Sequence, residues 1–526
     1  MTVIVAWASV RECHPRGALC LWALPNGYEG ADSSILVPEC PYKAPARLVT
    51  SAGLRKRSSP NPRDVPETAD STDAEQPPMP QTRCVEAPSI IYTQSGDVSI
   101  AYAISGQGPT DIVFVHGYIG NLEVEWEDPG HVAFFTKLAT DSRVIRFDRR
   151  GSGLSDRVRD VPTLETRMDD LRAVMDAAGS PRAVLVATFE ATAMAMLFAA
   201  TYPERVAGLV LFYPLAKGVW APEYPFAPTE DDYREEFEQI RTGWGEPAQA
   251  ERFIREAAPS IAGDPRFVAW TTRMFRQGAS PGAALALRRM VINVDVRDIL
   301  PSIHVATLIV HTSVRRDESE YIAERIPGAR RLELSGRERV FWLADGFPEA
   351  ITDFARAVWG EPEPETLLAT VLFTDIVGST AKAAELGDRS WRKLIERHHA
   401  VVRAQLDRYR GREFDTAGDG FFATFDGPIR AIQCAVAVRT AVRELGLEIR
   451  AGLHTGECEL IGEKPGGIAV NLGARVAAKA QPGEVLVSQT VKDLVAGSGI
   501  TFQDRGPAQL KGIPGTWRLY AVAAAA

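Results

Sequence analysis

Residues 369–380 read ATVLFTDIVGST, and this stretch decides the fold of the C-terminal part of the chain. It opens with an apolar run of the length of a buried strand, and Asp375 follows near the expected strand end. Gly378 then permits a turn, and a helix is expected from about Arg389 to Tyr409. An acidic residue before a glycine-bearing turn can hold a metal ion, and the N–H groups of the turn can bind phosphate.

A second acidic turn follows in residues 413–425, EFDTAGDGFFATF, which are typical of a hairpin with Asp419 at its tip. If this hairpin lies beside the strand that precedes Asp375, the two acids converge on one site. Paired carboxylates suit two divalent cations that bridge a triphosphate. Taken singly, each acid is more often a plain turn residue, so the flanking residues decide the interpretation.

With these flanks, residues 367–523 resemble the class III nucleotidyl cyclases. The resemblance rests on four motifs, FTDIVGST (373–380), TAGDGFFATF (416–425), GIAVNLGARV (467–476) and LKGIPGTW (510–517). It implies an α+β, ferredoxin-like catalytic domain that forms a 3′,5′-cyclic nucleotide and pyrophosphate. It also implies that Asp375, Asp419 and the backbone carbonyl of Ile376 bind two Mg²⁺ or Mn²⁺ ions.

The same resemblance assigns roles to three residues near the C-terminus. Asn471 would orient the ribose, Arg475 would stabilise charge on the α-phosphate, and Lys511 would contact the terminal phosphates. Asn471 and Arg475 are four residues apart, so a helix places them on one face. In this family the metal acids come from one subunit and the Asn and Arg from the other, which implies a homodimer.

Two positions bear on which base is read. Adenine-selective members of the family carry a lysine and an aspartate where this chain has Asp415 and Lys464, so the two charges are exchanged. An acid can accept hydrogen bonds from guanine N1–H and its amino group, which favours GTP; alternatively, Asp415 and Lys464 pair with each other. Some cyclases of this family are fused to a hydrolase-like domain and tolerate unusual residues at these two positions. We therefore expect an adenylate cyclase that acts on ATP. The alternatives are a guanylate cyclase, or a ligand sensor whose cyclase domain is silent.

Residues 88–360 alternate short apolar strands with helices, which predicts a mostly parallel, doubly wound α/β sheet, with a helical lid at about 216–300. The stretches VFVHGYIGNLE (113–123), FDRRGSGLSDR (147–157) and FAATYPERVAGLVL (198–211) resemble the α/β-hydrolase fold. The first of these corresponds to the strand and oxyanion loop of that family.

The catalytic residues of a hydrolase are missing from this pattern. Phe189 stands where the family has its nucleophilic serine, alanine replaces both flanking glycines, and Arg339 stands at the histidine position. A phenyl ring has no nucleophilic atom, so covalent acyl catalysis is excluded. Since alanine tolerates positive φ poorly, we expect a less sharp turn. The domain is then either a sensor for a small molecule or a scaffold for dimerisation and stability.

The remaining features concern the whole chain of 526 residues. Its net charge of −9 argues against nucleic acid and anionic membranes as partners. No stretch is apolar enough to span a membrane, and six scattered cysteines indicate a cytoplasmic protein. Residues 1–87 are expected to be a disordered extension, because the segment from Pro41 to Pro80 is rich in proline and polar residues, and residues 361–366 a linker.

Overall fold

The computed structural model describes residues 87–158, 161–360, 366–461 and 464–524. The predicted extension 1–87 and linker 361–366 therefore lie outside the described residues, apart from Ala87 and Thr366. Residues Thr82–Ala526 form one compact unit. Among the described residues, no helix combines the length and the hydropathy that crossing a bilayer requires.

The first sheet has a parallel core, as predicted. Strands β4, β3, β5, β6, β7 and β8 run parallel to one another, whereas β2 runs antiparallel to both β1 and β4. All residues of β5 and β6 are buried, as expected for strands covered on both faces. The order is β1 (Ile90–Ser95), β2 (Val98–Ser105), β4 (Ser142–Phe147), β3 (Thr110–Val115), β5 (Ala183–Thr188), β6 (Val206–Phe212), β7 (Thr307–His311) and β8 (Arg330–Glu333).

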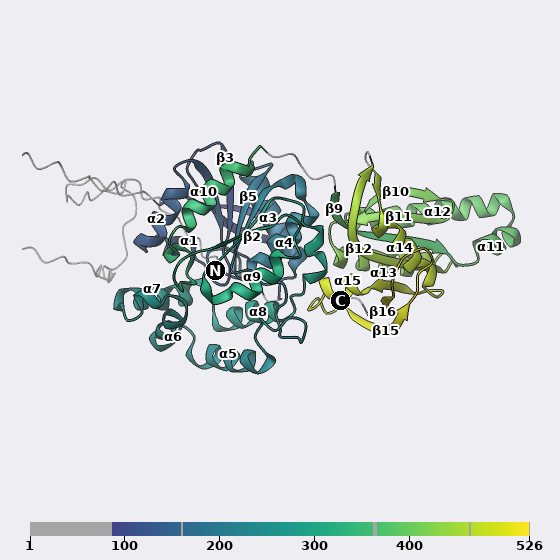
Figure 1. Ribbon diagram of the computed structural model, residues 1–526. Coiled ribbons are helices and arrows are strands. Elements are labelled where there is room, and N and C mark those ends of the chain that lie inside the picture. Colours follow the sequence, from purple (N-terminus) through teal and green to yellow (C-terminus); the bar gives the residue numbers. More distant parts are fainter. Residues whose placement is uncertain (1–86, 159–160, 361–365, 462–463, 525–526) are drawn as a thin grey trace, which may run out of the picture. The chain divides into compact units, whose positions relative to one another are not determined.

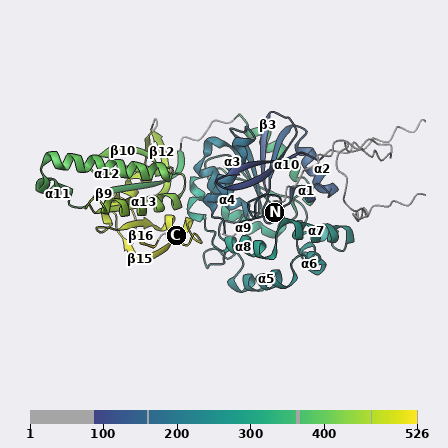
Figure 2. The same cartoon turned by 180° about the vertical axis from the view of Figure 1, so that it is seen from behind.

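Helices cover both faces of this sheet (Figures 1 and 2). The side chains of β5 alternate between the two faces of the sheet. Leu185 packs in one core with α3 (Leu164–Ala177) and α4 (Ala191–Thr201). Val186 packs in the other core with α2 (Pro129–Leu138) and α10 (Phe347–Val358). Short α1 (Leu122–Glu125) follows β3, and α9 (Arg316–Ala323) follows β7.

The predicted lid consists of four helices between β6 and β7, which lie together below the sheet in Figure 1. They are α5 (Glu230–Gly243), α6 (Pro247–Ala257), α7 (Pro265–Gly278) and α8 (Pro281–Ile292). Their apolar residues form two small cores, one of which includes Ile119 from the loop after β3. The lid therefore covers the end of the sheet where the sequence places a hydrolase-like site.

The second sheet is mixed and carries the cyclase motifs. Its order is β10 (Arg412–Ala417), β11 (Gly420–Phe425), β9 (Thr366–Ile376), β12 (Ile449–Ile461), β14 (Val485–Ser488), β16 (Trp517–Ala524) and β15 (Thr501–Ala508), with β13 (Lys464–Gly466) paired to β12. The long α12 (Asp388–Arg408) and α13 (Pro428–Arg443) pack on one face. The other face packs against α14 (Ile468–Lys479), while α11 (Ser379–Leu386) and α15 (Gln489–Leu494) are short.

Candidate active site

The two predicted metal acids lie at the same end of paired strands. β11 runs antiparallel to β9 with Phe421 opposite Thr374, so the turn at Gly418 and Asp419 comes alongside Asp375. The predicted hairpin and its place beside β9 are confirmed. The stacked rings of Phe373 and Phe422, with centroids 4.6 Å apart, fix this register from the sheet face that α14 covers.

Asp375 has a cationic partner that the sequence analysis missed. Arg450 lies directly opposite Asp375 in the pairing of β12 with β9, and its Nε and Nη2 donate to Asp375 Oδ2 at 3.1 and 2.6 Å. Both side chains are about two-fifths exposed. Only the strand register reveals this pair, because Arg450 stands outside the four motifs.

Asp419 is held at the hairpin tip without a partner for its carboxylate. Its Oδ2 is buried and has no hydrogen bond within the described residues. The ring of His399, on α12, lies with Nε2 3.0 Å from the carbonyl oxygen of Gly418 and supports the turn. Burial lowers the pKa of the neighbouring His398 to about 4, so this side chain packs as a neutral ring.

A divalent cation fits this arrangement. A buried carboxylate oxygen without a hydrogen bond is unfavourable, and a bound cation removes that penalty. Two carboxylates and the Ile376 carbonyl are hard oxygen ligands of the kind that Mg²⁺ prefers. The described residues contain no cluster of three or more His, Cys, Asp or Glu poised for a metal.

The three predicted phosphate and ribose residues form a second, exposed group. Asn471 and Arg475 lie on the exposed face of α14, whose opposite face buries Leu472 and Val476. The Nε of Arg475 donates to the backbone oxygen of Lys511 at 3.0 Å, which joins the helix to the loop after β15. Within the described part of the chain, no hydrogen bond or ion pair connects this group to Asp375 or Asp419.

The two predicted base-reading residues are both exposed. Asp415 lies opposite Phe422 next to an irregularity in the pairing of β10 and β11, and Lys464 begins β13. In the described ranges no ion pair links them, so each charge is available to a ligand.

The degenerate hydrolase turn is sharper than the sequence predicts. Phe189, between β5 and α4, has φ of 50°, whereas the flanking alanines keep negative φ. The expectation of a loosened turn is wrong because the left-handed conformation falls on Phe189 itself. The Phe189 N–H donates to the Phe212 carbonyl at 3.0 Å, and its ring stacks on Tyr213 with centroids 5.7 Å apart.

The carboxylate of Glu190 lies in the loop that corresponds to the oxyanion loop of the hydrolases. Glu190, directly after Phe189, is buried, accepts a hydrogen bond from the backbone N–H of Tyr118, and lies 3.2 Å from Nη1 of Arg149. The preceding N–H, of Gly117, donates to the Thr188 hydroxyl at 2.8 Å. An incoming acyl oxygen therefore finds these two donors already used.

Arg339, at the histidine position, is partly buried, and burial lowers the pKa of its guanidinium, with Arg315 as a second cause. A guanidinium cannot act as a general base near neutral pH. The fold and the turn of a hydrolase are thus retained, with Phe189 and Arg339 at the positions of its serine and histidine.

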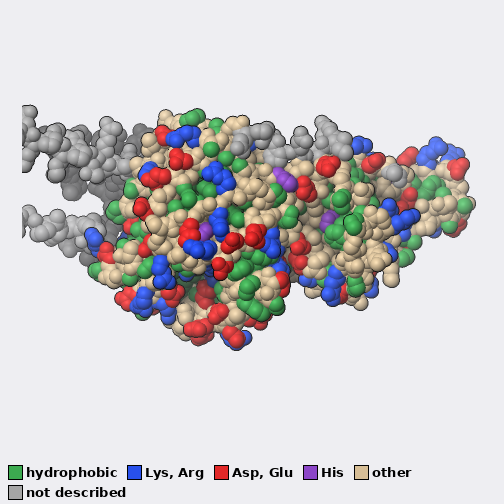
Figure 3. Space-filling view, in the orientation of Figure 1, with side chains coloured by type: hydrophobic (Ala, Val, Ile, Leu, Met, Phe, Trp, Pro, Cys, Tyr) green, Lys and Arg blue, Asp and Glu red, His purple; other side chains and the backbone are tan. Residues whose placement is uncertain are grey.

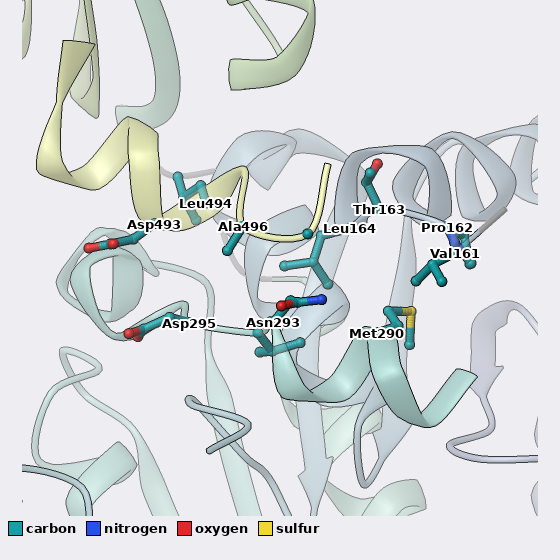
Figure 4. Close-up of a pocket in the computed structure, with 12 residues that line it drawn as sticks. Val161, Pro162, Thr163, Leu164, Met290, Asn293, Asp295, Asp493, Leu494 and Ala496 are labelled. Atoms are coloured by element: carbon teal, nitrogen blue, oxygen red, sulfur yellow. The ribbon is translucent and has the colours of Figure 1, made fainter. Parts of the chain in front are cut away.

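A separate pocket is shown in Figure 4, lined mainly by residues 161–164, 290–295 and 493–497. Asp295, one of its two acids, already pairs with Lys217 at 2.8 Å. None of the predicted site residues lines this pocket, so it is distinct from both sites above.

Comparison with known proteins agrees with this division. Residues 363–524 match the family described as the adenylate and guanylate cyclase catalytic domain, and residues 111–283 match the α/β hydrolase fold. The chain is 30% identical over 156 residues to putative adenylate cyclase 3 of Rhizobium meliloti (strain 1021), covering 28% of this chain and 26% of that protein.

Two further matches cover the two regions separately. The chain is 30% identical over 117 residues to a putative 2-succinyl-6-hydroxy-2,4-cyclohexadiene-1-carboxylate synthase of Bacillus subtilis (strain 168), covering 21% of this chain and 40% of that protein. The crystal structure of adenylyl cyclase CyaB from P. aeruginosa is 25% identical, with a TM-score of 0.29, and covers 31% of this chain and 97% of that one. The chain spans about a quarter or less of the first curated relatives it matches.

Proposed function

We propose, from the match of residues 363–524 to the adenylate and guanylate cyclase catalytic domain, that the chain is an adenylate cyclase that works as a homodimer. The observation that carries the proposal is the pair Asp375 and Asp419 on adjacent strands, one of them with a buried carboxylate oxygen that has no hydrogen bond. In the proposed reaction the ribose 3′-oxygen bonds to the α-phosphorus while the bond to the pyrophosphate oxygen breaks. The products are 3′,5′-cyclic AMP and pyrophosphate.

The side chains supply position and charge for this step. Asp375, Asp419 and the Ile376 carbonyl would hold two Mg²⁺ or Mn²⁺ ions, which supply positive charge at the 3′-oxygen and at the β- and γ-phosphates. Asn471 orients the ribose, Arg475 stabilises charge that grows on the α-phosphate, and Lys511 binds the terminal phosphates.

Arg450 adds a further role to this proposal. In the absence of nucleotide its guanidinium holds the Asp375 carboxylate in place. It is the cation beside the metal acids, so it also stands where a triphosphate brings negative charge.

A homodimer explains why, among the described residues, no hydrogen bond or ion pair joins the two groups of site residues within one chain. The exposed face of α14 carries Asn471 and Arg475, while Asp375 and Asp419 belong to the strand ends. Joining the strand ends of one subunit to α14 of another assembles two equivalent sites, a closed arrangement with two-fold symmetry.

The nucleotide base has two candidates, adenine and guanine. Asp415 and Lys464 are both exposed and unpaired with each other within the described residues. The likeness to an adenylate cyclase relative favours ATP. The exchange of charges favours guanine, which makes a guanylate cyclase the second candidate.

The hydrolase-like part is proposed to regulate the cyclase or to serve as its scaffold. A polar contact of α3 gives a physical route: Glu165 accepts a hydrogen bond at 3.0 Å from the backbone N–H of Ile429, in the first turn of α13. The N-cap of α13 is Gly427, which has no side chain to cap the helix, so Glu165 takes that place. A shift of α3 would therefore act directly on a helix of the cyclase core.

The test is a turnover assay on the purified full chain with Mn²⁺, supplying ATP and GTP separately and resolving the products by chromatography. Cyclic AMP with stoichiometric pyrophosphate supports the proposal, and cyclic GMP alone supports the second candidate. Absence of both products, in protein that melts cooperatively, refutes the enzymatic proposal.

A further inference from the structure

Three arginines surround the buried Glu190 beneath the lid. Arg149, Arg167 and Arg288 come from the loop after β4, from α3 and from α8. Burial by itself would raise the pKa of Glu190, yet its pKa lies below the ordinary value because Arg149, Arg288 and Arg167 outweigh the loss of water. The surroundings of this carboxylate are therefore strongly positive.

The arginines are unequally partnered. Arg149 lies 3.2 Å from Glu190, and Arg288 pairs with Glu236 at 2.7 Å. The guanidinium of Arg167 has one contact within the described residues, from Nη1 to the sulfur of Met290 at 3.5 Å. The Nη2 atoms of both Arg149 and Arg167 are buried and have no hydrogen-bond partner there.

The neighbouring acids form no ion pair with Arg167 within the described residues. Asp170 is bound to Arg150 at 2.7 Å, and Asp148 accepts backbone N–H groups of Leu122 and Leu154 at 3.2 and 2.8 Å. Arg149 and Arg288 each have a glutamate as ion-pair partner, which leaves Arg167 as the one of the three arginines without such a partner there. A buried guanidinium without an ion-pair partner is strongly destabilising, so the fold has a reason to recruit an anion.

The apolar surroundings limit what this anion is. Trp244 and Phe275, both from the lid, stack with centroids 5.0 Å apart, and the ring of Tyr118 meets that of Trp244 at 6.4 Å. Arg288 in turn lies over Tyr118, 5.8 Å from the ring centre. A group of aromatic rings beside one guanidinium that lacks an ion-pair partner suits an organic monoanion better than a phosphate.

We propose that the hydrolase-like part binds a small aromatic or otherwise apolar monocarboxylate, whose carboxylate bridges the free Nη2 atoms of Arg149 and Arg167. Glu190 keeps the Tyr118 N–H, so the ligand adds to the cluster instead of replacing Glu190. The lid helices cover the cluster, so they must part for the ligand to enter. This site is independent of the proposed cyclase activity, and its test needs no turnover.

The test measures melting temperature and heat of binding for the full chain with acetate, benzoate and phenylacetate, and with benzamide and phenylacetamide as uncharged matches. At about ten times the dissociation constant, a carboxylate should raise the melting temperature by about 2 °C. The amides should leave it unchanged. If none of the carboxylates binds, or if the amides bind equally well, the proposal is overturned.

Two variants locate the effect. Arg167→Met removes the unpaired guanidinium and keeps an apolar contact with Met290, so the ligand-free melting temperature should hold or rise while the carboxylate shift disappears. Arg143→Met is the matched control, because Arg143 is a partly buried arginine already paired to Asp111 at 2.7 Å. This control should lower the melting temperature and keep the carboxylate shift. A loss of stability in Arg167→Met equal to that of the control would show that Arg167 is already compensated and would refute the site.

Discussion

Replacing Asp375 by Asn separates the chemistry of the proposed active site from the stability of its sheet. The substitution keeps the shape of the side chain and removes its charge. Among the described residues the carboxylate has one side-chain partner, Arg450, at 2.6 Å, and both side chains are about two-fifths exposed. Exposed ion pairs contribute about 0–1 kcal/mol. We therefore expect the free energy of unfolding to fall by less than about 1 kcal/mol.

The effect on turnover should be far larger. An amide is a weak ligand for Mg²⁺ or Mn²⁺, and the proposed reaction depends on positive charge that those ions place at the 3′-oxygen and the phosphates. Losing a group that stabilises the transition state lowers kcat about 10²–10³-fold, or about 3–4 kcal/mol. Stabilisation of the folded chain by added Mn²⁺ should fall as well, because the ion binds the native state through this carboxylate.

The assay combines denaturant unfolding with cyclic nucleotide formation at saturating ATP and Mn²⁺. Asp504→Asn is the control, because Asp504 is an aspartate of similar exposure paired to Arg518 at 3.0 Å and lies on β15. The control should lose as little stability as Asp375→Asn and keep full turnover. Turnover of Asp375→Asn within tenfold of the unaltered chain would refute the assignment of Asp375 as a metal ligand. A parallel loss of turnover in both variants would attribute the loss to folding.

Three further predictions follow from the two sites. Asp375→Asn and Arg475→Ala are each expected to be inactive alone. Mixed in equal amounts, they should regain about a quarter of full turnover, because half of the dimers contain one subunit of each kind and carry one intact site. If subunit exchange is confirmed and no turnover returns, the shared site is contradicted. Asp415→Lys should shift the ratio of kcat/KM for ATP over GTP about tenfold or more toward ATP, and an unchanged ratio means that this position does not read the base. Phe189→Ser should show no p-nitrophenyl ester hydrolysis, because Glu190 still occupies the oxyanion loop. The loss of the ring should lower the free energy of unfolding by about 1–2 kcal/mol. Ester turnover that a serine-directed inhibitor blocks would contradict the prediction that Glu190 prevents hydrolysis.

Much of the first sheet is predictable because its strands are continuous apolar runs. The residues of β7 (Thr307–His311) form such a run, and all five are buried. The convergence of Asp375 and Asp419 is predictable only in part, because the sequence indicates the hairpin and its tip, whereas the pairing of β11 with β9 brings that tip alongside Asp375.

Contacts that depend on tertiary register could not be predicted. Arg450 meets Asp375 only because β12 pairs with β9 in one register, and a shift of one residue would turn its side chain to the other face. The cap that Glu165 supplies to α13 joins residues far apart in the sequence, so no local pattern indicates it.

The turn at Phe189 keeps the sharp backbone conformation of a hydrolase turn, although its side chain has no nucleophilic atom. Positive φ in a residue other than glycine carries strain of about 1–3 kcal/mol, which persists only where surrounding contacts hold it. Here the hydrogen bond to Phe212 and the ring stack on Tyr213 hold Phe189 at φ of 50°. The carboxylate of the next residue, Glu190, then accepts a hydrogen bond from the Tyr118 N–H and forms an ion pair with the buried Arg149. A simple scaffold would gain more stability from apolar residues at these positions than from a buried ion pair. The retained turn and its charges therefore favour a binding role for this part of the chain over a purely structural one.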